Sequence, residues 1–311
     1  MGGGGGYSGS SDNYKDHLRQ SRSTSEDASF ESDVNGMMND RLKSYNDRDS
    51  EQFKAHLDDI KDIIETRFEG AVKLRFGGSV SKHTYVDGLS DADILMLINN
   101  SELADYSPDQ ILSYVKRELS GRLHNVEETK TGSMAVTIKF RDGCEIQLIP
   151  AVSTPTGYKV PKKDSNEWSK VVHPDRFAQK LTEVNQSCSG KVIPVIKLAK
   201  GVIANLPEDQ RLTGYHVESL AIEVFKKYPT DMPNTPKVML KYFFEQASKR
   251  VTSPITDSSG QSVHTDDYLK AVNSPDRLRA QRTLQRIHTS MQNADNLRSR
   301  DAWDKILGEI Q

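Results

Sequence analysis

A glycine, a serine and two aspartates in the first third of the chain could hold a phosphorylated ligand together with metal ions. Gly78-Ser79 ends an alternating, β-like run that starts at Val72. Glycine lets the backbone approach a ligand closely, so phosphate oxygens could meet backbone N–H groups and the Ser79 hydroxyl. Asp91 and Asp93 open a second alternating run, which places both carboxylates on one strand face. Such a pair favours bound magnesium or manganese, although a Gly-Ser turn before a solvated acidic strand gives the same residues.

A third acidic residue is the next requirement. A site for two metal ions, about 3.5–4 Å apart, usually includes a carboxylate from a neighbouring strand. Residues 144–152 (CEIQLIPAV) read as that strand. Glu145 and Gln147 share one of its faces and lie about 6.6 Å apart along it. The strand therefore offers one carboxylate and one neutral amide to the predicted site.

The order and spacing of these residues resemble a known superfamily, the polymerase-β-like nucleotidyltransferases. Within it, the chain is most similar to the CD-NTases (cGAS/DncV-like enzymes of the bacterial CBASS type), which are related to the oligoadenylate synthetases. The resemblance rests on Gly78-Ser79, on Asp91-Ala92-Asp93 and on a strand that ends Gln147-Leu148-Ile149-Pro150-Ala151. It implies an α+β fold, with a polymerase-β-like nucleotidyltransferase sheet lobe and a helical C-terminal lobe joined by a long N-terminal spine helix.

A later apolar segment with two lysines adds to the resemblance. Residues 195–202 (VIKLAKGV) look like the family's helix with a phosphate-binding lysine. That lysine falls on Lys200, with Lys197 as the alternative. The resemblance implies that Ser79 and Lys200 hold the β- and γ-phosphates of a nucleoside triphosphate.

Two further segments resemble parts of the family that face the nucleotide. Residues 213–221 (TGYHVESLA) are similar to the helix opposite the site, and residues 253–268 to a late loop of the form Pro-x-x-Asp-x-x-Gly. The resemblance implies that Tyr215 and Glu218 contact the nucleobase. His216, among apolar neighbours, is expected near the site as a packing or hydrogen-bonding residue and not as a catalyst.

The chain departs from the family at the third acidic position. The family usually has aspartate where this chain has Gln147, and a neutral amide is a poor replacement for an anionic ligand. Glu145 is the favoured third acid, so the predicted metal ligands and catalytic residues are Asp91, Asp93 and Glu145, with two Mg²⁺ or Mn²⁺ ions. The alternatives are a site that binds nucleotide with little or no turnover, and a glutamine introduced to trap a complex.

The resemblance implies an enzyme that joins ATP and other ribonucleoside triphosphates into a cyclic di- or trinucleotide second messenger and releases pyrophosphate. In bacteria such a product serves antiphage signalling and is read by a separate effector protein. A linear oligonucleotide synthase is the closest alternative. A non-catalytic nucleotide-binding regulator and a nucleotidyl-transferring modifier of RNA or protein also fit the residues.

Composition favours a soluble, cytoplasmic protein. The net charge is −2, which gives no general attraction to nucleic acid. Two cysteines do not predict a disulfide framework, and neither an apolar run of about 18 residues nor a signal peptide is apparent. No His/Cys cluster has zinc spacing, so the zinc element of the family's vertebrate DNA-sensing members is absent, and the resemblance does not imply activation by bound DNA.

The segments that must position the site follow from periodicity. Residues 1–35 are predicted to be a disordered Gly/Ser-rich tail, residues 36–173 the spine helix and nucleotidyltransferase core, and residues 174–311 the helical lobe. The spine helix is expected at residues 39–68 and the sheet at 72–152, interrupted by a helix at 108–123. Five helices are expected in the second lobe, at residues 174–187, 190–205, 214–228, 236–250 and 275–309.

Two basic segments could contact ligands or partners. Residues 158–168 read as a basic loop between the lobes, which could touch substrate phosphates or remain a solvated loop anchored by Trp168. Arg277, Arg279, Arg282 and Arg286 fall at surface-like positions of the last helix. A solvated charged face is the preferred interpretation, and an interaction surface is the alternative.

Overall fold

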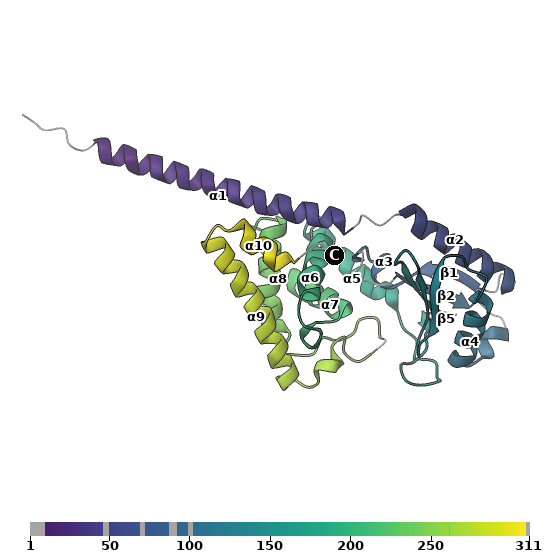
Figure 1. The fold of residues 1–311 in the computed structure, drawn as a ribbon. Helices are drawn as coiled ribbons and strands as arrows, with labels where there is room; N and C mark the ends of the chain where they lie inside the picture. The colour runs from purple at the N-terminus through teal and green to yellow at the C-terminus, as the bar shows by residue number, and fades with distance from the viewer. Residues whose placement is uncertain are drawn as a thin grey trace, which may run out of the picture.

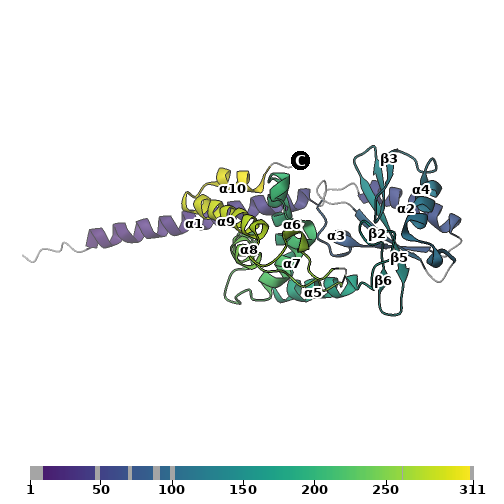
Figure 2. The same ribbon diagram turned by 90° about the horizontal axis from the view of Figure 1, so that it is seen from below.

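The computed structural model describes residues 10–45, 50–68, 72–86, 92–98, 102–260 and 262–308. Two lobes lie side by side, one built around a β-sheet and one of helices (Figure 1). A view turned by 90° shows α3 (Gly78–Ser81) where the two lobes meet (Figure 2). The α+β architecture predicted from the sequence is confirmed.

In the described part of the chain, six strands form one sheet in the order β1-β2-β5-β4-β3, with β6 paired to β5. They are β1 (Val72–Phe76), β2 (Ala92–Ile98), β3 (Val126–Thr131), β4 (Val136–Phe140), β5 (Glu145–Ser153) and β6 (Tyr158–Lys159). β2 and β5 run parallel, whereas the other pairs are antiparallel. The parallel pair brings the strand of Asp93 beside the strand of Gln147.

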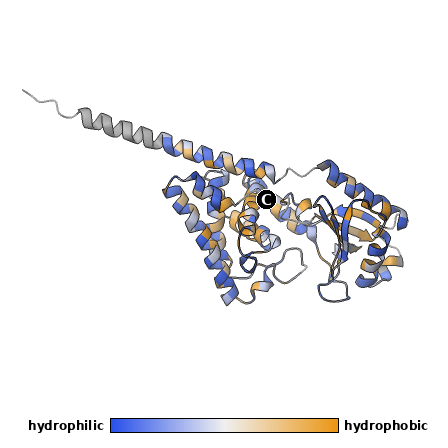
Figure 3. Cartoon of the chain, in the orientation of Figure 1, coloured by the Kyte–Doolittle hydropathy of each residue, from blue (hydrophilic) through white to orange (hydrophobic). Residues whose placement is uncertain are grey.

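The two faces of the sheet have different surroundings. Ile94, Met96 and Ile98 of β2 are buried in a core that also contains apolar side chains of α2 (Ser50–Arg67) and α4 (Pro108–Leu119). Because side chains alternate along a strand, Asp93 and Leu95 point to the opposite face, where both line a pocket shared with the helical lobe. Hydrophobic residues concentrate in the sheet and in the inner helices, while the outer helices are largely hydrophilic (Figure 3).

The helical lobe contains the helices expected from the sequence, with one correction. They are α5 (Pro174–Ser187), α6 (Val192–Ala204), α7 (Gly214–Phe225), α8 (Pro236–Arg250), α9 (Pro275–Asn296) and α10 (Arg300–Leu307). The predicted single helix at residues 275–309 is wrong, because Arg298 has a left-handed backbone (φ +46°) that ends the first helix. Ser299 then caps α10, its hydroxyl accepting the Ala302 N–H at 3.1 Å. No helix in the described ranges is long and apolar enough to span a membrane.

The N-terminal segment differs most from the prediction. A helix, α1 (Ser10–Ser44), replaces the predicted disordered tail from residue 10 onward, while residues 1–9 lie outside the described ranges. Val34 and Met38 are fully buried against the helical lobe. The buried Lys237 ammonium bonds Glu31, and the Lys237 N–H donates to Asn35 at 3.0 Å. Tertiary contacts of residues 31–38 therefore hold the second half of α1 on the helical lobe, although its polar composition resembles that of a disordered tail.

The predicted continuous spine helix at residues 39–68 is also wrong. α1 ends at Ser44 and α2 begins at Ser50, with residues 46–49 outside the described ranges. α1 packs on α6, α8 and α10 of the helical lobe, whereas α2 packs on α4 and β1 of the sheet lobe. Each lobe therefore has its own N-terminal helix.

Arg277 is fully buried, so its predicted surface position is wrong. Its guanidinium donates to Asp266 Oδ2 at 2.6 Å and to the Val251 and Lys270 carbonyls at 3.1 and 3.0 Å. The buried Asp266 carboxylate also lies 3.5 Å from His216 Nε2. Hydrogen bonding to a charged partner is the usual condition for burying an arginine in a core. This network anchors the loop between α8 and α9.

His216 should make folding stability fall as the pH drops from 6.5 toward 4. It is fully buried, and its Nδ1 lies 2.7 Å from the Tyr268 hydroxyl, as expected for a packing residue. Burial lowers its pKa to about 4, with Arg277 and Arg250 adding to the shift and Asp266 opposing it. Between pH 6.5 and 4 the unfolded chain then binds more protons than the folded one, which costs up to about 3 kcal/mol of stability.

Urea unfolding at several pH values measures this loss. His216→Asn, which keeps a polar atom near the Nδ1 position, is expected to flatten the decline of the unfolding free energy between pH 6.5 and 4.5. His124→Asn is the matched control, because His124 is exposed. An equal decline in wild type and His216→Asn would contradict this assignment.

Candidate active site

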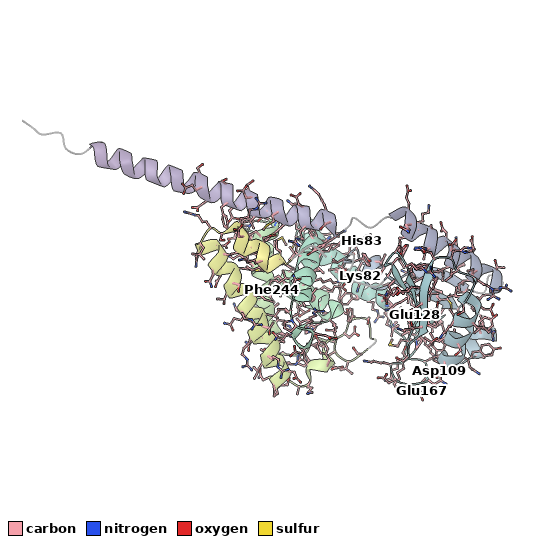
Figure 4. All side chains as sticks on the ribbon, viewed as in Figure 1. Lys82, His83, Asp109, Glu128, Glu167 and Phe244 are labelled. Carbon is pink, nitrogen blue, oxygen red and sulfur yellow. The ribbon has the colours of Figure 1, made fainter. Side chains whose placement is uncertain are left out.

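A pocket of about 440 Å³ lies between the two lobes. Figure 4 shows Lys82 and His83 at this junction. Lining residues come from the segment around α3, from β2 and β5, and from α5, α6 and α7. Those with polar or aromatic side chains are Ser79, Ser81, Lys82, Asp93, Phe177, Lys200, Tyr215, Glu218 and Ser259. Most predicted site residues that the structure describes therefore converge here.

The Gly-Ser turn lies directly against Asp93. Gly78 has a left-handed backbone (φ +46°), and a Cβ added to it would lie 1.6 Å from Asp93 Oδ2. The Gly77 N–H donates to the Asp93 carbonyl at 2.8 Å, which ties the turn to β2. Only glycine fits at position 78, because both the backbone angle and the carboxylate exclude a side chain. The pattern recognised in the sequence is thus one contiguous structure.

The register of the parallel strands determines which residues lie beside Asp93. Asp93 pairs with Gln147, and Ile146 pairs with Ala92. Gln147 therefore shares the face of Asp93, while Glu145 lies two positions earlier on that face and pairs with Lys139 of β4. Neither Glu145 nor Gln147 is among the residues that line the pocket. Asp91, the other predicted ligand, lies outside the described residues.

The side-chain oxygens near Asp93 are of a kind that binds hard cations. The described donors on the face of Asp93 are carboxylate and amide oxygens, which are the ligands that magnesium and manganese prefer. Within the ranges that the structure describes, no three His, Cys, Asp or Glu side chains come together as a metal site. The predicted two-metal site therefore depends on Asp91 in addition to the residues seen here.

Lys200 reaches the pocket from α6 through a buried network. Its ammonium donates to Glu218 Oε1 at 2.8 Å and to the Thr84 carbonyl at 2.9 Å. Glu218, predicted to contact the nucleobase, also accepts from Thr84 Oγ1 at 2.5 Å and from Lys82. Lys197 is half-buried and is not among the residues that line the pocket, so the geometry favours Lys200 over this alternative.

Charge balance in this network is visible in its pKa shifts. Burial lowers the pKa of Lys200, while the Glu218 carboxylate raises it. Burial alone would raise the pKa of Glu218, but Lys82 and Lys200 outweigh it and hold that pKa below its ordinary value. Glu218 is therefore an anion that keeps two buried ammonium groups together.

Tyr215 forms an aromatic wall with Phe177 of α5. Their ring centroids are 4.6 Å apart at an interplanar angle of 38°. The Tyr215 hydroxyl donates to Asp257 Oδ1 at 2.7 Å, which anchors the loop that carries Ser259 into the pocket. Burial, reinforced by the Asp257 carboxylate, raises the pKa of Tyr215. Phe177 is buried and Tyr215 is half-buried, and an aromatic side chain at a pocket wall can stack on a nucleobase.

Sequence reasoning missed three residues of the site. Lys82 and Thr84 follow the Gly-Ser turn and reach Glu218 across the lobe junction, and Phe177 packs on Tyr215. The one available signal in the sequence was that Lys82 and Thr84 lie between Gly78-Ser79 and Asp91-Ala92-Asp93, the two parts of the motif. Nothing local distinguishes Phe177 from other core residues of α5.

The fold is that of the polymerase-β-like nucleotidyltransferases. The family described as "Second Messenger Oligonucleotide or Dinucleotide Synthetase domain" (SMODS) matches residues 30–185, slightly more than half of the 311-residue chain. The chain belongs to this family and is a CD-NTase, as the sequence predicted. No curated protein is similar enough in sequence to count as a match.

Solved CD-NTase structures share the fold over most of both chains. The Vibrio cholerae cyclic AMP-GMP synthase DncV, in complex with the linear intermediate 5′ pppA(3′,5′)pG, has a TM-score of 0.61 at 12% identity and covers 96% of this chain and 89% of its own. The Bradyrhizobium diazoefficiens CD-NTase CdnG, in complex with GTP, has a TM-score of 0.61 at 15% identity, covering 89% and 95%. The Elizabethkingia meningoseptica cyclic dinucleotide synthase CdnE, with GTP and Apcpp, has a TM-score of 0.59 at 14% identity, covering 75% and 90%.

Proposed function

We propose that this protein joins ribonucleoside triphosphates, ATP among them, into a cyclic di- or trinucleotide and releases pyrophosphate. Membership of the SMODS family supports the reaction class. The closeness of Gly78 to the Asp93 carboxylate is the observation that carries the proposal, since it brings the turn expected to bind phosphate against the acid expected to hold a cation. The product would act as a second messenger in antiphage (CBASS) signalling, read by a separate effector.

Asp91, Asp93 and Glu145 would hold two magnesium or manganese ions in this proposal. When bound, such ions would stabilise the charge that develops during phosphoryl transfer and would lower the pKa of the attacking ribose hydroxyl. Glu145 is retained as the third acid because it is the carboxylate on the same face of β5 as Gln147. Asp93 and the Gly-Ser turn fix where the phosphates and the cations meet.

The remaining residues bind and orient the triphosphate. Ser79 and Lys200 line the same pocket as Asp93 and would hold the β- and γ-phosphates. The aromatic wall of Tyr215 and Phe177 would take the base. In the joining step, the ribose hydroxyl of one nucleotide forms a bond to the α-phosphorus of the next, and the bond to pyrophosphate breaks.

A nucleotide-binding regulator without turnover is a second candidate. The observation that favours it is the register of Asp93 with Gln147, which places a neutral amide where an anionic ligand is usual. Such a protein would bind nucleoside triphosphates in the same pocket. It would release no pyrophosphate.

Pyrophosphate release from a mixture of the four ribonucleoside triphosphates, with magnesium or manganese, separates the two candidates. Wild type is expected to release pyrophosphate. Glu145→Gln is expected to lower the rate at least about tenfold, because it removes the third carboxylate. Glu128→Gln, an exposed glutamate on β3, is the matched control.

Gln147→Asp tests whether position 147, and not Glu145, must supply the third carboxylate. If Glu145 is the third acid, this variant is expected to stay within about threefold of wild type. An inactive wild type with an active Gln147→Asp variant would reject the enzyme and establish the regulator.

A further inference from the structure

Glu218 lies at the centre of a cluster drawn from both lobes. It is 1% exposed, on α7, and each of its carboxylate oxygens accepts a lysine ammonium. Lys200 comes from α6 of the helical lobe, and Lys82 follows α3 of the sheet lobe. Thr84 also donates to this carboxylate, and its backbone N–H donates to the Ser79 carbonyl at 3.0 Å. One buried acid therefore connects both lysines to the Gly-Ser turn.

Within the cluster, two lysine ammonium groups share the single carboxylate of Glu218, while Asp93, the other acid that lines the pocket, is the proposed cation ligand. Lys82, Lys200 and Glu218 all line the pocket. The side chains of Lys82 and Lys200 are 10% and 8% exposed. Burying a second lysine is unnecessary if the only task is to neutralise Glu218, because Lys200 alone does so. A second ammonium group at a pocket wall instead suits a polyanionic ligand.

Aromatic rings support the position of Lys82. Its ammonium lies 4.8 Å from the Phe177 ring centroid and 5.1 Å from that of Tyr215. These cation–π contacts add to the ion pair with Glu218, and they stabilise the ammonium without adding a further negative charge that would repel a bound anion. The same rings form the wall proposed to receive the base, so the Lys82 ammonium lies on the side of the pocket where the base is expected.

We propose that Lys82 is a second phosphate-binding lysine beside Lys200, and that Glu218 is a positioning residue that holds both ammonium groups at the pocket. This inference rests on the proposed function, because the anion in question is the triphosphate of its substrate. Glu218 then acts through the lysines and does not contact the base.

Titration with two adenine nucleotides tests the inference. The first is an ATP analogue with a carbon bridge between the α- and β-phosphates, which cannot release pyrophosphate, and the second is AMP. Lys82→Met is expected to weaken binding of the analogue at least about tenfold, the effect of one charge-assisted hydrogen bond. It should change AMP binding by less than about twofold, and Lys82→Arg should restore most of the affinity for the analogue.

Glu218→Gln tests the positioning role. It is expected to weaken binding of the analogue about as much as Lys82→Met does. The double variant Lys82→Met/Glu218→Gln should bind the analogue about as well as the weaker-binding single variant, because the two residues act as one unit. Lys226→Met is the matched control, since it breaks a partly exposed pair with Glu223 at 2.9 Å near the end of α7. Thermal melting of each variant verifies folding, and the Lys82 variants decide the inference if Glu218→Gln does not fold.

The two possible failures give different results. Tight binding of the analogue by both wild type and Lys82→Met would overturn the role of Lys82 and leave the proposed function intact. Absence of binding of either nucleotide by wild type would overturn the proposed function and this inference with it.

Discussion

Asp93→Asn is expected to reduce nucleotide joining at least about a thousandfold, because the substitution removes a carboxylate that we propose as a ligand of the catalytic cations. The asparagine is isosteric, so it fits against Gly78 and should leave the fold unchanged. The measurement is the rate of pyrophosphate release from nucleoside triphosphates with magnesium or manganese. Asp91→Asn is expected to behave in the same way.

The control for this substitution is Asp231→Asn, an exposed aspartate in the turn after α7. It should keep the wild-type rate. A rate for Asp93→Asn within about tenfold of wild type would show that Asp93 does not hold the catalytic cation.

Gly78→Ala is expected to lower the rate at least about a hundredfold, because misplacing reacting groups by about 1 Å has effects of this size. The new methyl carbon would lie 1.6 Å from Asp93 Oδ2, so the carboxylate or the turn must move. The left-handed backbone adds about 1–2 kcal/mol of strain to the folded state. Both the pyrophosphate assay and thermal melting report on the variant.

Gly121→Ala is the control that separates backbone strain from the steric clash with Asp93. Gly121 also has a left-handed backbone (φ +76°), but an added Cβ would meet nothing within 4 Å. This variant should lose a similar amount of stability and keep its activity. Equal activity losses in the two glycine variants would mean that the contact with Asp93 has no functional importance.

Local patterns in the sequence predicted the sheet and its motifs well. The alternation of residue types along β2 and β5 is a short-range feature, and so is the pair of glycines before Ser79. The structure places Gly78 against Asp93, as the motif suggested. The strand that carries Gln147 was also found, but its register with Asp93 was not predictable. Register depends on how two strands more than 50 residues apart align, and no local pattern encodes that alignment.

Long-range contacts account for what the sequence did not predict. Lys82 and Glu218 are 136 positions apart, so their ion pair is invisible to a periodicity argument. Arg277 has the spacing of a surface arginine, and only its contact with Asp266 explains its burial. α1 has a polar composition, and it is ordered by contacts such as that of Val34 with a lobe whose core lies more than 140 residues later in the chain.

We propose that this chain joins nucleotides into a small cyclic product. The most direct test incubates the protein with the four labelled ribonucleoside triphosphates and magnesium or manganese, treats the mixture with phosphatase, and separates the products by chromatography. We expect a small phosphatase-resistant product from wild type and none from Asp93→Asn. Complete conversion of the label to nucleosides and inorganic phosphate, or its transfer to a macromolecule, would contradict the account.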